Sequence, residues 1–144
     1  MDDYFMLAYY SLRLIGWQLD TFNALDTKAI GLLGFNVGLG ALMAQAHALM
    51  TGYRLAFFIG LFFSALAGLQ ALRIGRIYLG PDARRLYALN RQPAEEPITA
   101  QLVADLGRNY AINALPLAQK GWYCLLSAGL LVCSLVVAGI GSIV

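Results

Sequence analysis

The chain has 144 residues, of which 60% are hydrophobic and only 12% are charged. Soluble domains carry about 25% charged residues, so this composition indicates a protein surrounded by lipid. Its ten Lys and Arg residues and eight Asp and Glu residues leave a net charge of +2, too small to indicate a general affinity for nucleic acid. The first residues, Met1-Asp2-Asp3, lack the positive charge typical of a removable signal peptide.

Residues 1–28 are predicted to form a cytoplasmic or interfacial amphipathic helix. Apolar residues recur there at alternating spacings of three and four: Phe5, Ala8, Leu12, Ile15, Leu19 and Phe22. Either lipid or a partner helix covers this seam. Because the polar side carries more acidic than basic residues, a partner helix is favoured over an anionic lipid surface.

Three stretches without charged side chains predict transmembrane helices, since about 20 apolar residues cross the hydrocarbon core. The first is 29–53, and the second is 54–72 after a tight turn at Thr51-Gly52-Tyr53-Arg54. Residues 73–120 form a cytoplasmic basic loop and helix, and 121–144 form the third span. The expected fold is an all-α membrane protein with three transmembrane helices and two cytoplasmic amphipathic helices, one N-terminal and one preceding the third span.

The distribution of basic residues predicts the orientation in a bacterial inner membrane, because basic flanks are retained in the cytoplasm. Only Arg54 lies between the first and second spans. The N-terminus is therefore expected in the cytoplasm and Val144 at the periplasmic face. The flanks assigned to the cytoplasm contain Arg13, Lys28, Arg73, Arg76, Arg84, Arg85, Arg91, Arg108 and Lys120.

The amphipathic helix before the third span is expected from Ile98 onward, after the loop residues Gly80-Pro81-Asp82 and 92–97. Its apolar face contains Val103, Leu106, Tyr110 and Leu117. Asn113 interrupts this face, and Pro116 predicts a kink before the membrane. We expect this helix to pack beside the N-terminal one.

The first span contains three polar residues, Asn36, Gln45 and His47, although unsatisfied polar groups in lipid cost several kcal/mol. Asn36 and His47 are eleven positions apart and share a helix face. All three are candidate pore-lining residues. The alternative is that Asn36 and Gln45 form hydrogen bonds across packed helices.

Gly34 and Gly38 form a GxxxG pattern, which Ala41 extends along the same stripe. Small residues allow helix backbones to approach closely. The stripe therefore predicts helix packing, either within one subunit or between copies of the chain.

The basic segment after the second span is a candidate signal-binding site formed by Arg84, Arg85, Tyr87 and Arg91. Guanidinium groups bind phosphates, and a tyrosine ring stacks on a base. The alternative is that these charges contact anionic lipid headgroups.

No pattern indicates catalysis, a cofactor or a metal site. The sequence has no Gly-rich phosphate loop that opens a helix and no nucleophile beside a base. Cys124 and Cys133 are nine positions apart, on opposite faces of a helix, so neither a disulfide nor a metal site follows from them.

The entry to the first span contains Asp26-Thr27-Lys28-Ala29, followed by Leu32-Leu33-Gly34 and Asn36. This combination resembles the Pycsar-effector transmembrane family of bacterial antiviral defence, in which an N-terminal helix runs into an Asp-x-Lys-Ala start of the first span. The order of spans and Lys120 before the last span are similar as well. The motif residues that carry over are Asp26 and Lys28, which we expect to hold the helix entrance in register.

The resemblance implies an oligomeric, signal-gated channel or pore that permeabilises the inner membrane when a nucleotide or oligonucleotide signal appears during phage infection. A nucleotide cyclase or nucleotidyltransferase is the implied partner. Without a large sensor domain, the signal is expected to bind the cytoplasmic helices and basic loop, or a separate protein. The alternatives are a non-conducting anchor or scaffold for a soluble enzyme and a phage holin.

Overall fold

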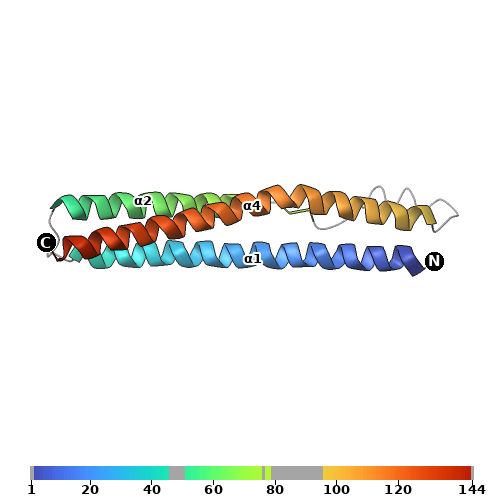
Figure 1. Cartoon of the computed structure of the whole chain (residues 1–144), viewed down its shortest axis with the longest axis horizontal. Helices are drawn as coiled ribbons and strands as arrows, with labels where there is room; N and C mark the ends of the chain where they lie inside the picture. Colours follow the sequence, from blue (N-terminus) through green and yellow to red (C-terminus); the bar gives the residue numbers. More distant parts are fainter. Residues whose placement is uncertain (1, 46–50, 76, 79–95, 144) are drawn as a thin grey trace. The chain divides into compact units, whose positions relative to one another are not determined.

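The computed structural model describes residues 2–45, 51–75, 77–78 and 96–143. These residues form three helices: α1 at Asp2–Gln45, α2 at Thr51–Arg73 and α4 at Glu96–Gly141 (Figure 1). Each contains a stretch long and apolar enough to cross a membrane. The predictions of an all-α fold and of three candidate spans are therefore confirmed for the described residues.

The two predicted amphipathic helices are not separate elements. The segment before the first span belongs to α1, which runs without a break from Asp2 to Gln45. The segment before the third span belongs to α4, which continues through Pro116. Proline removes one backbone donor but leaves the following residues free to propagate the helix, and such positions are tolerated in membrane helices.

The predicted tight turn at 51–54 is wrong, because α2 already begins at Thr51. The first helix is described as far as Gln45, and residues 46–50 lie outside the described residues. Arg54, in the first turn of α2, donates from Nη2 to the carbonyl oxygen of Ala44 at 2.8 Å. The last carbonyls of a helix have no partners within it, and a basic side chain is a common donor to them. Arg54 thus caps α1.

The chain divides into two compact units, and α1 and α4 contribute to both. The first unit contains Met1–Asn23 and Arg76–Ala118, and the second contains Ala24–Gly75 and Gln119–Val144. In the second unit the later parts of α1 and α4 run parallel, and α2 is antiparallel to both, as its contacts with them show. Apolar and polar layers alternate along this three-helix bundle.

In the first unit, the earlier parts of α1 and α4 pack through one buried face of each helix. Ile15 and Phe22 lie on the buried face of α1, as predicted, whereas Leu12 is 52% exposed. Gln18 is buried between Ile15 and Phe22. The apolar pattern predicts Leu19 at this level of the buried face, but the side chain buried there is that of its neighbour Gln18. The side chains of Phe5 and Ala8 lie outside the described part.

Candidate functional site

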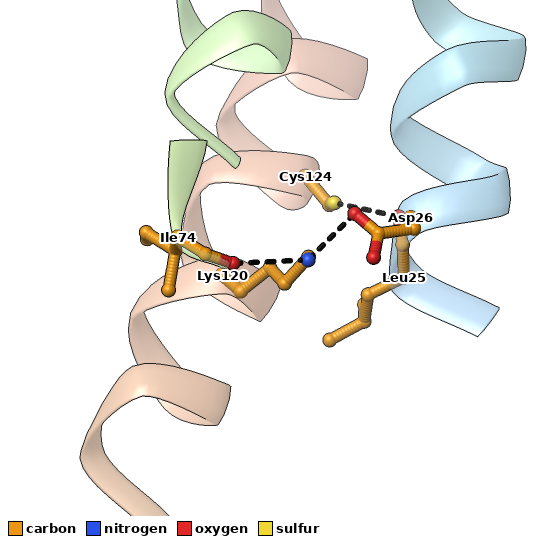
Figure 2. Close-up of polar contacts among 5 residues, drawn as sticks. All are labelled: Leu25, Asp26, Ile74, Lys120 and Cys124. Atoms are coloured by element: carbon orange, nitrogen blue, oxygen red, sulfur yellow. Dashed lines mark hydrogen bonds and ion pairs between the residues drawn. The ribbon is translucent and has the colours of Figure 1, made fainter. Parts of the chain in front are cut away.

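The second unit contains a buried lysine that joins its three helices. Lys120 on α4 has a side chain with no exposed surface, and its Nζ lies 2.6 Å from Oδ1 of Asp26 on α1 (Figure 2). The same Nζ donates to the carbonyl oxygen of Ile74 at 3.2 Å. We call Asp26, Lys120 and the Ile74 carbonyl the clamp.

The position of Ile74 explains why the ammonium is stable there. Ile74 directly follows Arg73, the last residue of α2, so its carbonyl belongs to the end of the helix that carries partial negative charge. A carboxylate and a helix C-terminus together compensate the buried positive charge. A buried charge without such partners would be very costly.

The thiol of Cys124 lies one turn beyond Lys120 and donates to the carbonyl oxygen of Leu25 at 3.6 Å (Figure 2). Cys124 also packs with Ala29 and Ala71 in a small apolar cluster. All three side chains are short, so the three helices approach closely beside the clamp.

A second polar layer, which we call the serine layer, is formed by Asn36, Ser64 and Ser127. The hydroxyl of Ser64 donates to the Ser127 carbonyl at 2.7 Å, and the hydroxyl of Ser127 donates to the Ser64 carbonyl at 2.8 Å. Asn36 Nδ2 donates to Ser64 Oγ at 3.0 Å. Among the described residues no partner is found for Asn36 Oδ1, which is fully enclosed. The layer therefore links all three helices without any net charge.

Beyond the serine layer, the interior is apolar and tightly packed. Phe57, Leu61, Leu131 and Ala138 form its buried centre. On α2, Gly60 faces Ser134 so closely that a Cβ at Gly60 would collide with the Ser134 hydroxyl. Small residues thus set the distance between α2 and α4 at this level.

The structure places two of the predicted pore residues on opposite faces of α1. Asn36 is buried in the serine layer, whereas Gln45 is exposed. They are nine positions apart, about two and a half turns of a helix, which places them on opposite sides of it. A pore lined by both therefore requires two different surfaces of α1. His47 lies outside the described residues.

The predicted packing residues Gly34, Gly38 and Ala41 all face outward from the subunit. A Cβ at Gly34 or Gly38 would meet no atom within 4 Å. The second unit uses the opposite face of α1 for its own packing, so these residues are open to contact from outside.

The motif residues Asp26 and Lys28 have different surroundings. Asp26 belongs to the clamp, and Lys28 is exposed. Residues two positions apart on a helix do not face each other, so a shared role at the helix entrance is not supported by their geometry. The predicted signal-binding residues Arg84, Arg85, Tyr87 and Arg91 lie outside the described residues.

The first unit has a polar core of its own, formed by Gln18 and Asn113. Gln18 Nε2 donates to the Tyr110 carbonyl at 3.1 Å, and Asn113 Nδ2 donates to Gln18 Oε1 at 3.3 Å. Asn113 also accepts from the backbone N–H of Tyr78 and donates to its carbonyl, both at 2.9 Å. Asn113, predicted as an interruption of the apolar face, is buried and binds the backbone of Tyr78 in the segment after α2.

Sequence reasoning missed the partners in these layers. The count of flanking charges does not predict a partner for Lys120. A repeat with alternating spacings of four and three nevertheless begins at this residue: Lys120, Cys124, Ser127, Leu131, Ser134 and Ala138. That repeat, read with its polar members included, would have placed Lys120 and Ser127 on one buried face. In the described ranges no group of three or more His, Cys, Asp or Glu residues is placed to hold a metal ion.

Comparisons with protein-family models, curated proteins and solved structures find no match for this chain. The resemblance at Asp26 and Lys28 therefore rests on the residues quoted for it. The second unit itself is a three-helix bundle with alternating polar and apolar layers, an ion pair between the buried Lys120 and the partly exposed Asp26, and an outward stripe of small residues on α1.

Proposed function

We propose that this chain is one subunit of an oligomeric membrane effector of bacterial anti-phage defence, which makes the inner membrane leak when a nucleotide or a partner protein signals infection. The observation that carries the proposal is the stripe on the outer face of α1. Its members repeat at alternating spacings of three and four and are all exposed: Ala24, Thr27, Gly31, Gly34, Gly38, Ala41 and Gln45.

This stripe is suited to contact with another membrane helix. Every member but Gln45 is small, and glycine lets two backbones approach closely enough for extensive van der Waals contact. The stripe lies opposite Asn36, which points into the subunit's own interior. A second copy of the chain can therefore pack on α1 without disturbing the bundle.

Assembly is also what a conducting path requires. The interior of the second unit is filled by the serine layer and by the apolar centre around Phe57 and Leu61. A path for ions must then lie between subunits or require the helices to rearrange. In either case the exposed Gln45 is a better pore candidate for the assembled state than the enclosed Asn36.

The clamp is the candidate gate. In sequence, Asp26, Ile74 and Lys120 each lie within two residues of the points where the second unit begins or ends. A signal acting on the first unit would reach the clamp through the continuous helices α1 and α4. On the resemblance at Asp26 and Lys28, we propose that this signal is a nucleotide.

Ion flux from vesicles containing the purified full chain tests the proposal. We expect Gly34→Leu with Gly38→Leu to abolish both self-association and nucleotide-dependent flux, because the leucines keep the backbones apart. Gly129→Leu is the matched control, since a Cβ at Gly129 also meets nothing within 4 Å and Gly129 lies on α4, away from the stripe.

Full flux from the Gly34, Gly38 variant would overturn the role of the stripe. Absence of flux from wild-type vesicles with every cyclic mono- and dinucleotide tested, and with the cognate cyclase present, would overturn the channel function.

A non-conducting anchor is the second candidate, and one observation favours it. The part of α1 in the first unit exposes large apolar and aromatic side chains: Met6, Leu7, Tyr9, Tyr10, Leu12, Leu14 and Trp17, which range from 48% to 59% exposed. Such a surface suits a soluble partner protein. Stoichiometric recovery of one soluble enzyme with the wild-type chain, lost on Tyr10→Ser with Trp17→Ser, would favour the anchor.

A further inference from the structure

A groove of about 520 Å³ opens on the second unit between α1 and α4. Its lining is apolar apart from Lys28 and the Cys124 thiol. The lining residues are Leu25, Lys28, Gly31, Leu32, Phe35, Gly121, Cys124, Leu125, Ala128 and Leu131.

The groove exists because α1 and α4 carry glycines at its base, where larger side chains would fill the space between the two helices. A Cβ at Gly31 or at Gly121 would meet no atom within 4 Å. Phe35 and Leu125 form raised rims that are 55% and 69% exposed. The result is a groove with small residues at its base and apolar side chains along its sides, open to the surroundings of the bundle.

The length of the groove matches one membrane leaflet. Its residues cover 25–35 on α1 and 121–131 on α4, two parallel stretches that are each about 15 Å long. The hydrocarbon core of a bilayer is about 30 Å thick, so one leaflet is about half of that. A transmembrane helix from another copy would need a contact surface about twice as long.

The charge at one end of the groove is not compensated within the described residues. Lys28 is exposed, and its neighbour Asp26 directs Oδ1 toward Lys120. Lys28 forms no ion pair with any residue that the structure describes. It lies at the same end of the spans as the clamp, where headgroups begin.

From these observations we propose that the groove binds one acyl chain of an anionic phospholipid, whose phosphate group is held by Lys28. The apolar walls receive the chain over the depth of one leaflet. The ammonium group then gains a negative partner that the described residues do not supply at this position. The groove shares Gly31 with the stripe, but the lipid site does not rest on the channel function proposed above, since an anchor would bind the same lipid.

Native mass spectrometry of the full chain tests this site by titrating phosphatidylglycerol and, separately, phosphatidylcholine into detergent micelles. Gly121→Leu fills the groove, whereas Gly129→Leu on the same helix does not line it and is the matched control. We expect Gly121→Leu to lose retention of both lipids and Gly129→Leu to retain them.

Lys28→Gln tests the contact with the lipid headgroup separately from the contact between the acyl chain and the groove. We expect it to lower the affinity for phosphatidylglycerol about fivefold, the contribution of one basic residue near an anionic surface, and to leave phosphatidylcholine unchanged. Arg73→Gln is the control, because Arg73 is exposed at the same end of the spans but does not line the groove.

Three results would overturn the proposal. The first is equal lipid retention by the Gly121 and Gly129 variants. The second is loss of dimers, with lipid retention unchanged, on Gly121→Leu, which would assign the groove to a second copy of the chain. The third is retention of a free fatty acid in preference to phosphatidylglycerol, with the same dependence on Lys28, which would identify a different ligand.

Discussion

The clamp and the serine layer both join the three helices of the second unit, but by different means. The clamp places one full positive charge, with no exposed surface, between a carboxylate and a helix end. The serine layer uses neutral hydroxyl and amide groups that bond mainly to one another and to backbone carbonyls.

This difference determines how each layer responds to damage. Removing one member of a buried charge pair leaves the other uncompensated, whereas removing one neutral group leaves at most a few hydrogen-bonding atoms without partners. A single substitution in the clamp should therefore lower the free energy of unfolding strongly, whereas a single substitution in the serine layer should lower it only in part. The following variants test this comparison in order of decreasing effect.

Asp26→Asn should have the largest effect, because it removes the carboxylate facing the buried Lys120 ammonium. We expect a loss of about 3 kcal/mol in the free energy of unfolding, the lower end of the range for buried pairs because one third of the Asp26 side chain is exposed to solvent, measured by sodium dodecyl sulfate titration with circular dichroism. Adding Lys120→Met should restore much of it. Asp20→Asn, at an exposed position of α1, is the control. An Asp26→Asn protein as stable as this control would show that the clamp contributes little.

Gly60→Ala should come next, because the new methyl group collides with Ser134 on the facing helix. Overpacking of this kind typically costs about 1–3 kcal/mol. Ser134→Ala in the same chain removes the nearest atom and should recover part of the loss. Gly129→Ala, where the methyl group meets open space, should be neutral. A stable Gly60→Ala variant would mean that the Ser134 hydroxyl rotates away or that α2 and α4 move apart, and would contradict the predicted overpacking.

Ser64→Ala tests the serine layer itself. It removes the donor to the Ser127 carbonyl and the acceptor for Asn36 Nδ2. Hydrogen bonds between membrane helices contribute about 0.6–2 kcal/mol, so the same denaturation assay should show a loss in that range. Ser142→Ala, which removes an exposed hydroxyl bonded to Gly139, should be silent. A loss as large as that of Asp26→Asn would contradict the expectation that the serine layer tolerates a single substitution better than the clamp does.

Arg54→Gln should have the smallest effect, because it weakens only the cap on the Ala44 carbonyl. A basic side chain at a helix C-terminus contributes about 0.3–1 kcal/mol. Hydrogen exchange should rise in the last turn of α1 and stay unchanged around the clamp. Faster exchange throughout the second unit would show that Arg54 stabilises the whole bundle and not only the last turn of α1.

The spans were predictable because their signal is local. Long stretches without charge identify α2 and the later parts of α1 and α4, and the spacing of Ile15 and Phe22 identifies one packed face. The helix boundaries were less predictable. Gly52 suggested a turn, yet it lies in the first turn of α2, and Arg54 two residues later binds the end of the preceding helix.

The layers were not predictable from local pattern, because their partners are far apart in the chain. Asp26 was selected together with Lys28, its neighbour in sequence, but its partner is Lys120. An apolar periodicity does not count amides, so it leaves Gln18 out and treats Asn113 only as an interruption, although both side chains are buried. Only the fold shows which polar groups meet, and the predicted roles of Gln45 and the basic loop stay predictions.

The ion pair between Asp26 and Lys120 also has a consequence for biosynthesis. Asp26 is translated early, and its partner emerges only when the last helix is made. Until then the nascent chain lacks the lysine with which Asp26 pairs in the folded protein. Completion of the third helix therefore supplies the side chain that joins all three helices at this level of the bundle.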